Sequence, residues 1–143
     1  MKIMKIMKAT EETEEMKVTE TISTTRNEIV SLFLMIREAR NGKLSREALV
    51  KYVMLRVKMK SLFDEYEKVR QEISEQTKPD DWKEGDSSER WDKAFRPVME
   101  KWLIEPSGID TKIFTDEDCA DFILSNPDKD GTYIDTLTHY FKI

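Results

Sequence analysis

The chain has 143 residues, a length typical of one domain and sufficient to bury an apolar core. Charged residues make up 37% of it, and four Gly and four Pro are too few for a strand-rich fold with many tight turns. The single cysteine excludes an internal disulfide, and no apolar run approaches the ~18 residues of a membrane span.

Residues 1–22 are predicted to form an N-terminal arm that precedes a helical domain over residues 23–143. Met-Lys-Ile repeats there with a period of three, which matches neither a helix nor a strand. An acidic patch follows, so the segment can bury little apolar area by itself. The start also lacks the apolar core of a secretory signal. We therefore expect a cytoplasmic location, or one within a virus particle assembled in the cytoplasm.

Residues 23–77 predict a helical hairpin, the main part of an all-α fold. Apolar residues on a four-three-four spacing indicate a first helix over residues 27–40. We expect Asn41-Gly42 to end this helix, because Gly accepts the left-handed conformation. Ser45 is predicted to cap a second helix over residues 46–77, and the short connection makes the two helices antiparallel.

The second helix carries a heptad seam that predicts helix-on-helix packing. Its first half has two further apolar stripes, so we expect that half to be enclosed on several sides. At 1.5 Å per residue the helix is about 48 Å long, too long for the first helix to cover. The seam consists of Ala48, Tyr52, Leu55, Met59, Leu62, Tyr66, Val69 and Ile73, and the further stripes consist of Val50, Met54 and Val57 and of Leu49, Val53 and Phe63.

A polar loop over residues 78–87 leads to a third helix over residues 88–104. Asp86 and Glu89 have the spacing of a capping box. Pro97 is expected to kink the helix or split it. We expect the aromatic face of this helix to cover the far end of the seam within the same chain. The alternatives are that another subunit covers it and that the aromatic side chains are exposed partner anchors. That face consists of Trp91, Phe95, Val98 and Trp102.

Residues 105–143 are predicted to form an irregular tail with short helices. Residues 109–114 are interpreted as extended and are compatible with one edge strand. Thr115 and Asp118 predict the start of a short acidic helix. A last short helix is expected near Leu137 and Phe141, although its threonines are also compatible with a strand.

The segment SNPDKDG resembles a calcium-binding loop, and we reject it as a metal site. Asn126, Asp128 and Asp130 fall at the first three ligand positions of an EF-hand loop. The position of the closing bidentate Glu is occupied by Leu137, which has no oxygen ligand. We interpret the segment as a turn.

The sequence contains little that could support catalysis. His139 is the only histidine, and neighbouring carboxylates should raise the pKa of Cys119 and suppress its thiolate. Phosphate-binding loops, zinc spacings and nucleophile elbows are absent from the sequence. We therefore expect a protein that is not an enzyme and that uses no cofactor or metal.

Charge is distributed unevenly. Eight basic and two acidic residues give residues 37–60 a charge of +6, so the rest of a chain with net charge −5 carries −11. This basic region is either a solvated helix face or a contact for phosphates or an acidic protein surface. The partner-binding candidates are Arg37, Arg40, Lys43, Arg46, Lys51, Arg56, Lys58 and Lys60, together with Trp82 in the polar loop.

Two hypotheses for function follow from these features. The first is a non-enzymatic structural or assembly protein that joins other subunits, homo- or hetero-oligomeric, in a larger complex; a phage virion accessory protein would fit. The second is a small acidic regulator or inhibitor of a nucleic-acid-handling enzyme, whose acidic faces stand in for phosphates. We expect neither membrane association nor direct nucleic-acid binding, since the acidic remainder opposes the latter.

Overall fold

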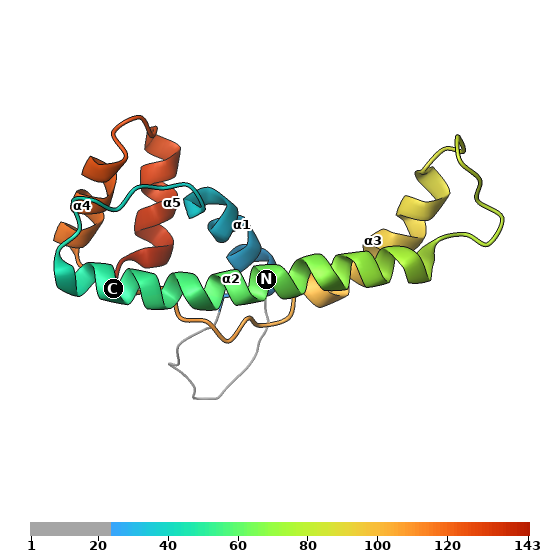
Figure 1. Ribbon diagram of the computed structural model, residues 1–143, viewed down its shortest axis with the longest axis horizontal. Coiled ribbons are helices and arrows are strands. Elements are labelled where there is room, and N and C mark those ends of the chain that lie inside the picture. Colours follow the sequence, from blue (N-terminus) through green and yellow to red (C-terminus); the bar gives the residue numbers. More distant parts are fainter. Residues whose placement is uncertain (1–23) are drawn as a thin grey trace, which may run out of the picture.

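The computed structural model describes residues 24–143, and the predicted N-terminal arm, residues 1–22, lies outside the described residues. The described residues form a mainly α-helical fold, as predicted. Helices α1, α4 and α5 lie beside one half of the long helix α2, and α3 lies along the other half (Figure 1). The helices are α1 (Arg26–Ile36), α2 (Arg46–Thr77), α3 (Glu89–Leu103), α4 (Asp116–Ser125) and α5 (Gly131–Phe141).

Helix α2 has the predicted bounds, and we call residues 46–61 its proximal half and residues 62–77 its distal half. The Ser45 hydroxyl accepts a hydrogen bond from the Ala48 amide, so Ser45 is the predicted N-cap. The helix ends before Pro79, which cannot continue it. Seven residues of the helix are buried, and six of these belong to the predicted seam.

Helix α1 begins at a capping box, in which the Thr25 hydroxyl accepts from the Glu28 amide and the Glu28 carboxylate accepts from the Thr25 amide. It ends at Ile36, four residues earlier than predicted. The carbonyl oxygens at this end are satisfied: the Arg56 guanidinium of α2 donates to those of Ile36 and Arg37, and the Ala39 amide also donates to that of Ile36. Gly42 does not end α1, and its φ is not positive.

The main core lies between α1, the proximal half of α2 and the C-terminal helices. Tyr52 is 1% exposed and stacks on Phe114, with ring centroids 6.2 Å apart, and it also contacts Phe122 at 5.4 Å. On the α1 side, the rings of Phe33 and Phe63 lie 5.1 Å apart. Aromatic rings therefore connect segments that are far apart in the sequence, and this burial is the main stabilising contribution.

The C-terminal region contains the two predicted short helices, α4 and α5. Thr115 and Asp118 form the predicted start of α4 as a full capping box. The possible edge strand is wrong: residues 109–114 form no regular strand, and only an isolated bridge joins Phe114 to Lys142. The reason is that the Phe114 amide and carbonyl bond to Phe141 and Ile143 at the end of α5, and no neighbouring strand is present in the described chain.

Helix α3 covers the distal half of α2, as predicted. The rings of Trp102 and Tyr66 lie 6.3 Å apart, and the Arg26 guanidinium lies 4.4 Å from the Trp102 ring centroid. Ile73 of α2 and Met99 of α3 are both buried. Helix α3 continues through Pro97 and is not split there. Its one buried residue is Met99, whereas Val98, which was expected on the buried face, is 43% exposed.

The predicted capping box at the start of α3 is wrong. Ser88 is the N-cap, and its side chain makes no capping hydrogen bond to a helix amide; its hydroxyl donates to the Asp92 carboxylate at 3.4 Å. The Asp86 carboxylate accepts from the Lys83 amide within the preceding loop.

Replacing Arg56 should destabilise the fold, because two α1 carbonyls would lose a charged donor. We expect Arg56→Met to lower the free energy of unfolding by about 2–3 kcal/mol and Arg56→Lys to recover only part of this. Urea denaturation measures both. Lys60→Met is the matched control: it removes an exposed ion pair with Asp64 and should cost under about 1 kcal/mol. Equal losses for Arg56→Met and Lys60→Met would contradict this role.

Tyr133 and Tyr140 should respond oppositely to loss of the hydroxyl. The Tyr133 hydroxyl is buried without a hydrogen-bond partner among the described residues, whereas the Tyr140 hydroxyl donates to Glu28 Oε2 at 2.8 Å. Tyr133→Phe should therefore raise the free energy of unfolding at pH 7 by about 1 kcal/mol, and Tyr140→Phe should lower it by a similar amount. Thermal and urea unfolding of both variants measure the signs.

The same Tyr133→Phe variant should also change how the free energy of unfolding depends on pH in the alkaline range. Burial, followed by the charges of Tyr52 and Asp128, raises the pKa of Tyr133 from 10.0 to about 12. The unfolded chain therefore loses this proton first, and the free energy of unfolding falls as the pH rises from about 10 to 12. Tyr133→Phe should lose less stability over this range than the unmodified chain; an identical slope would contradict the assignment.

Candidate functional site

Four apolar side chains form an exposed stripe along the outward face of α2. Their positions i, i+3, i+4 and i+7 place them on one face of the helix. The opposite face carries the buried Tyr52, Leu55 and Met59. We call the exposed set the outer stripe; it consists of Val50 (51% exposed), Val53 (48%), Met54 (60%) and Val57 (64%).

The outer stripe corrects the expectation that the proximal half of α2 is enclosed on several sides. Of the two additional apolar stripes, only Leu49 (half-buried) and Phe63 (buried) pack against the core. The reason is that α1, α4 and α5 all lie on the side of the heptad seam (Figure 1), so the described chain leaves the opposite face uncovered.

A shallow groove of about 530 Å³ adjoins the outer stripe where α1 meets α2. Val53 and Val57 border it on one side, and Phe33 and Phe63 are aromatic lining residues. Arg37, at the end of α1, lies with its guanidinium 5.9 Å from the Phe63 ring centroid. The groove therefore combines an apolar lining with charged side chains of both signs: Arg37, Arg56 and Lys60 on one hand, Asp64 and Glu67 on the other.

The predicted basic candidates are mostly exposed and surround this surface. Within the described chain, Arg46, Lys51 and Lys58 form no ion pair, whereas Lys60 lies 2.8 Å from an Asp64 carboxylate oxygen. Arg37, Arg40 and Lys43 occupy the connection between α1 and α2 and are also exposed. The backbone of this connection is held by α4: the Arg40 amide donates to Asn126 and the Lys43 amide donates to Ser125.

Arg56 differs from the other basic candidates. Its guanidinium donates to two α1 carbonyls and to the Tyr52 hydroxyl at 3.3 Å, and lies 5.6 Å from the Phe33 ring centroid. Burial, the largest influence, raises the pKa of that Tyr52 hydroxyl, although Arg56 acts to lower it. Arg56 thus has a structural role that its position in a basic run did not reveal.

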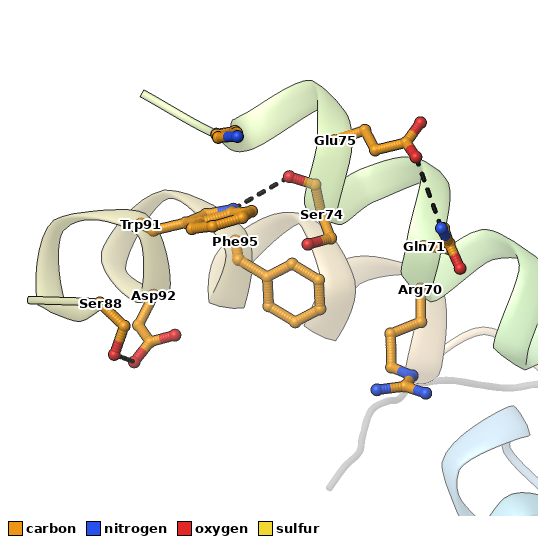
Figure 2. Close-up of a pocket in the computed structure, with 9 residues that line it drawn as sticks. Arg70, Gln71, Ser74, Glu75, Ser88, Trp91, Asp92 and Phe95 are labelled. Carbon is orange, nitrogen blue, oxygen red and sulfur yellow. Dashed lines mark hydrogen bonds between the residues drawn. The ribbon is translucent and has the colours of Figure 1, made fainter. Parts of the chain in front are cut away.

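Trp82 lies apart from this surface, at the far end of the molecule. Its ring meets Trp91 edge-on with centroids 5.1 Å apart, and Lys78 lies over both rings. Figure 2 shows the adjacent cleft, where Trp91 and Phe95 of α3 face α2 and the Trp91 indole donates to the Ser74 carbonyl at 2.9 Å. This cleft of about 540 Å³ is open and lined by side chains of both charges.

The rejected calcium-like loop has structural roles. Asn126 is buried: its side-chain oxygen accepts from the Arg40 amide, and its side-chain nitrogen donates to the carbonyls of Arg40 and Phe122. Asp130 is the N-cap of α5 and accepts from the Tyr133 amide. In the described part of the chain, no three His, Cys, Asp or Glu side chains are grouped so as to hold a metal ion.

The two candidate nucleophilic or basic groups, Cys119 and His139, differ in exposure. Cys119 is buried, and burial, followed by the charges of Asp116 and Asp118, raises the pKa of its thiol as predicted. His139 is exposed near the end of α5 and meets Tyr140 edge-on. A thiol that keeps its proton is a poor nucleophile.

Comparisons with protein-family models, with curated proteins and with solved structures found no match for this chain. No helix in the described part of the chain combines the length and apolarity needed to cross a membrane.

Polar substitutions in the outer stripe should leave the isolated protein stable. We expect Val53→Ser with Met54→Gln to change the free energy of unfolding by less than about 1 kcal/mol, since both side chains are exposed. Leu55→Ala, on the buried face of the same helix, should cost about 2–5 kcal/mol. Chemical denaturation compares the two. A large loss in the stripe variant would show that the stripe is already covered in solution.

Proposed function

We propose that this protein is a non-enzymatic structural or assembly component that joins other protein subunits in a larger complex, using the outer stripe as its contact. The observation that carries the proposal is the continuous apolar face of Val50, Val53, Met54 and Val57 on a helix whose other face is already packed. Contiguous exposed apolar patches on soluble proteins typically mark interaction sites.

Local physics supports this interpretation of the stripe. Valine is a weaker helix former than Ala, Leu or Lys, because its branched side chain loses rotamer freedom in a helix. An exposed valine therefore lowers helix stability and leaves apolar surface in water. The three valines on this face of α2 lower the free energy of the protein only when another surface covers them and removes them from water.

We further propose an accessory subunit of a phage particle that is assembled in the cytoplasm. A 16.9 kDa helical protein with an uncovered helix face suits an accessory subunit, and a phage particle assembled in the cytoplasm is one such assembly.

A second candidate function rests on the acidic distal half of α2. Asp64, Glu65, Glu67, Glu72 and Glu75 are all exposed there. A regulator that occupies a nucleic-acid-handling enzyme would present such a face in place of phosphates. Its binding would be salt-sensitive and would compete with nucleic acid, whereas subunit docking through the outer stripe would not.

Affinity purification of the tagged full-length chain from its native source tests the first function. We expect co-eluting structural proteins, which Val53→Ser with Met54→Gln should greatly reduce because the partner loses its apolar contact. Val98→Ser with Ile104→Ser is the matched control, since these residues are exposed and apolar on the α3 side of the molecule. Equal recovery with both double variants would contradict docking through the stripe. Recovery of a nucleic-acid-handling enzyme alone would favour the second function.

A further inference from the structure

We infer that the outer stripe binds an acidic amphipathic helix of a partner protein, which lies along the proximal half of α2. This inference rests on the proposed function and specifies the chemistry of the partner. Three features carry it: the spacing of the apolar residues, the basic side chains on both edges of the stripe, and the groove beside it.

The spacing fits a helix rather than a strand or a loop. Apolar side chains at i, i+3, i+4 and i+7 form a ridge that a second helix can accept between its own side chains at an interaxial distance of about 8–10 Å. From Arg46 to Lys60 the surface is about 21 Å long, at 1.5 Å per residue. A partner helix of about 14 residues, or four turns, matches this length.

Charge decides the composition of the partner. By helical periodicity, Lys51 and Lys58 border one edge of the outer stripe, on which Glu47 also lies, and Lys60 borders the other. Arg46 continues the line of the stripe at its N-terminal end. All four basic side chains are exposed, and Glu47 is the only carboxylate on α2 before Asp64. A partner with apolar residues on one face and Glu or Asp on both flanks would place its carboxylates beside these cations, as flanking charges do in helix pairs.

The groove beside the stripe offers an anchoring point. The largely buried rings of Phe33 and Phe63 form part of its lining, with Val53 and Val57 beside them. The charged lining residues include Arg37 and also Asp64, which pairs with Lys60 at 2.8 Å, and Glu67. One large apolar side chain of the partner could enter there and place a neighbouring carboxylate beside Arg37, away from Asp64 and Glu67. Hot spots of protein interfaces commonly have this arrangement of a buried apolar group with a charged rim.

A second copy of this chain is a poorer occupant. Two outer stripes facing each other would bring Arg46, Lys51, Lys58 and Lys60 of both copies together, and like charges repel. A displaced copy would set the stripe against the distal half of α2, whose matching face carries Asp64, Lys68, Gln71 and Glu75 and no apolar side chain. Neither arrangement both buries the apolar side chains and pairs opposite charges.

An anionic lipid surface also fits less well. The same helix continues into the distal half, where Asp64, Glu65, Glu67, Glu72 and Glu75 are exposed. A flat anionic membrane against α2 would meet this acidic half as well as the basic half. A short partner helix covers the basic half alone.

The test uses the full-length chain and two labelled synthetic peptides of 18 residues. Both carry Leu at a and d heptad positions; one has Glu and the other Lys at the flanking positions. Fluorescence anisotropy should show saturable binding of the Glu peptide, weakened by added salt, and no comparable binding of the Lys peptide. Val53→Ser with Met54→Gln should weaken binding roughly tenfold or more, while Val98→Ser with Ile104→Ser should leave it unchanged.

Charge reversal provides the sharper readout. Lys51→Glu with Lys58→Glu, which leaves the apolar stripe intact, should reduce binding of the Glu peptide and create binding of the Lys peptide. Circular dichroism checks that each variant remains helical, and both positions are exposed in α2. An unchanged preference after charge reversal would overturn the inference.

Four other outcomes would also overturn it. These are equal binding of both peptides, a dimer in solution that the stripe variant abolishes, co-sedimentation with phosphatidylserine vesicles that depends on the stripe, and peptide binding that appears only after Glu11, Glu12, Glu14 and Glu15 are replaced by Gln. In the last case the acidic segment of the same chain would be the occupant. If the peptides fail but co-purified subunits still require the stripe, the proposed function stands and only the acidic-helix inference falls.

Discussion

The length of α2 is the constraint on which the rest of the structure depends. A helix of 32 residues extends about 48 Å, three times the length of the 11-residue helices α1 and α5. No single neighbour can cover it, so two groups of side chains do so separately. Tyr52 and Met59 are buried in the proximal group, and Ile73 with Met99 of α3 in the distal one.

Polar side chains hold the helix ends and the irregular segments in place. Arg56 binds the end of α1, Asn126 binds the connection at Arg40, and Thr111 donates to the Tyr140 carbonyl at 2.6 Å. Each of these bonds satisfies a backbone group where regular structure stops. The connection that carries Arg37, Arg40 and Lys43 is therefore positioned by hydrogen bonds rather than by apolar packing, and its basic side chains remain exposed.

This arrangement gives the two faces of one helix different environments. The buried face of the proximal half holds the domain together, while the opposite face presents Val50, Val53, Met54 and Val57 to solvent between basic side chains. The distal half has the opposite charge and no apolar outer residues. A partner that contacted both halves of α2 would need an acidic region for the basic half and a basic region for the acidic half. This requirement favours short, specific partners over extended surfaces of one charge.

The sequence by itself determined the helices, their approximate ends and the heptad seam, because periodicity, caps and Pro79 act within a few residues. The Ser45 cap, the Thr115 capping box and the seam at Tyr52 and Met59 are local signals of this kind. Only the tertiary structure decided which apolar stripe is buried. Val50, Met54 and Val57 have the same spacing as core residues, and their exposure depends on which side α1, α4 and α5 occupy. The end of α1 and the role of Arg56 depend likewise on contacts between segments about twenty residues apart, which no local pattern records.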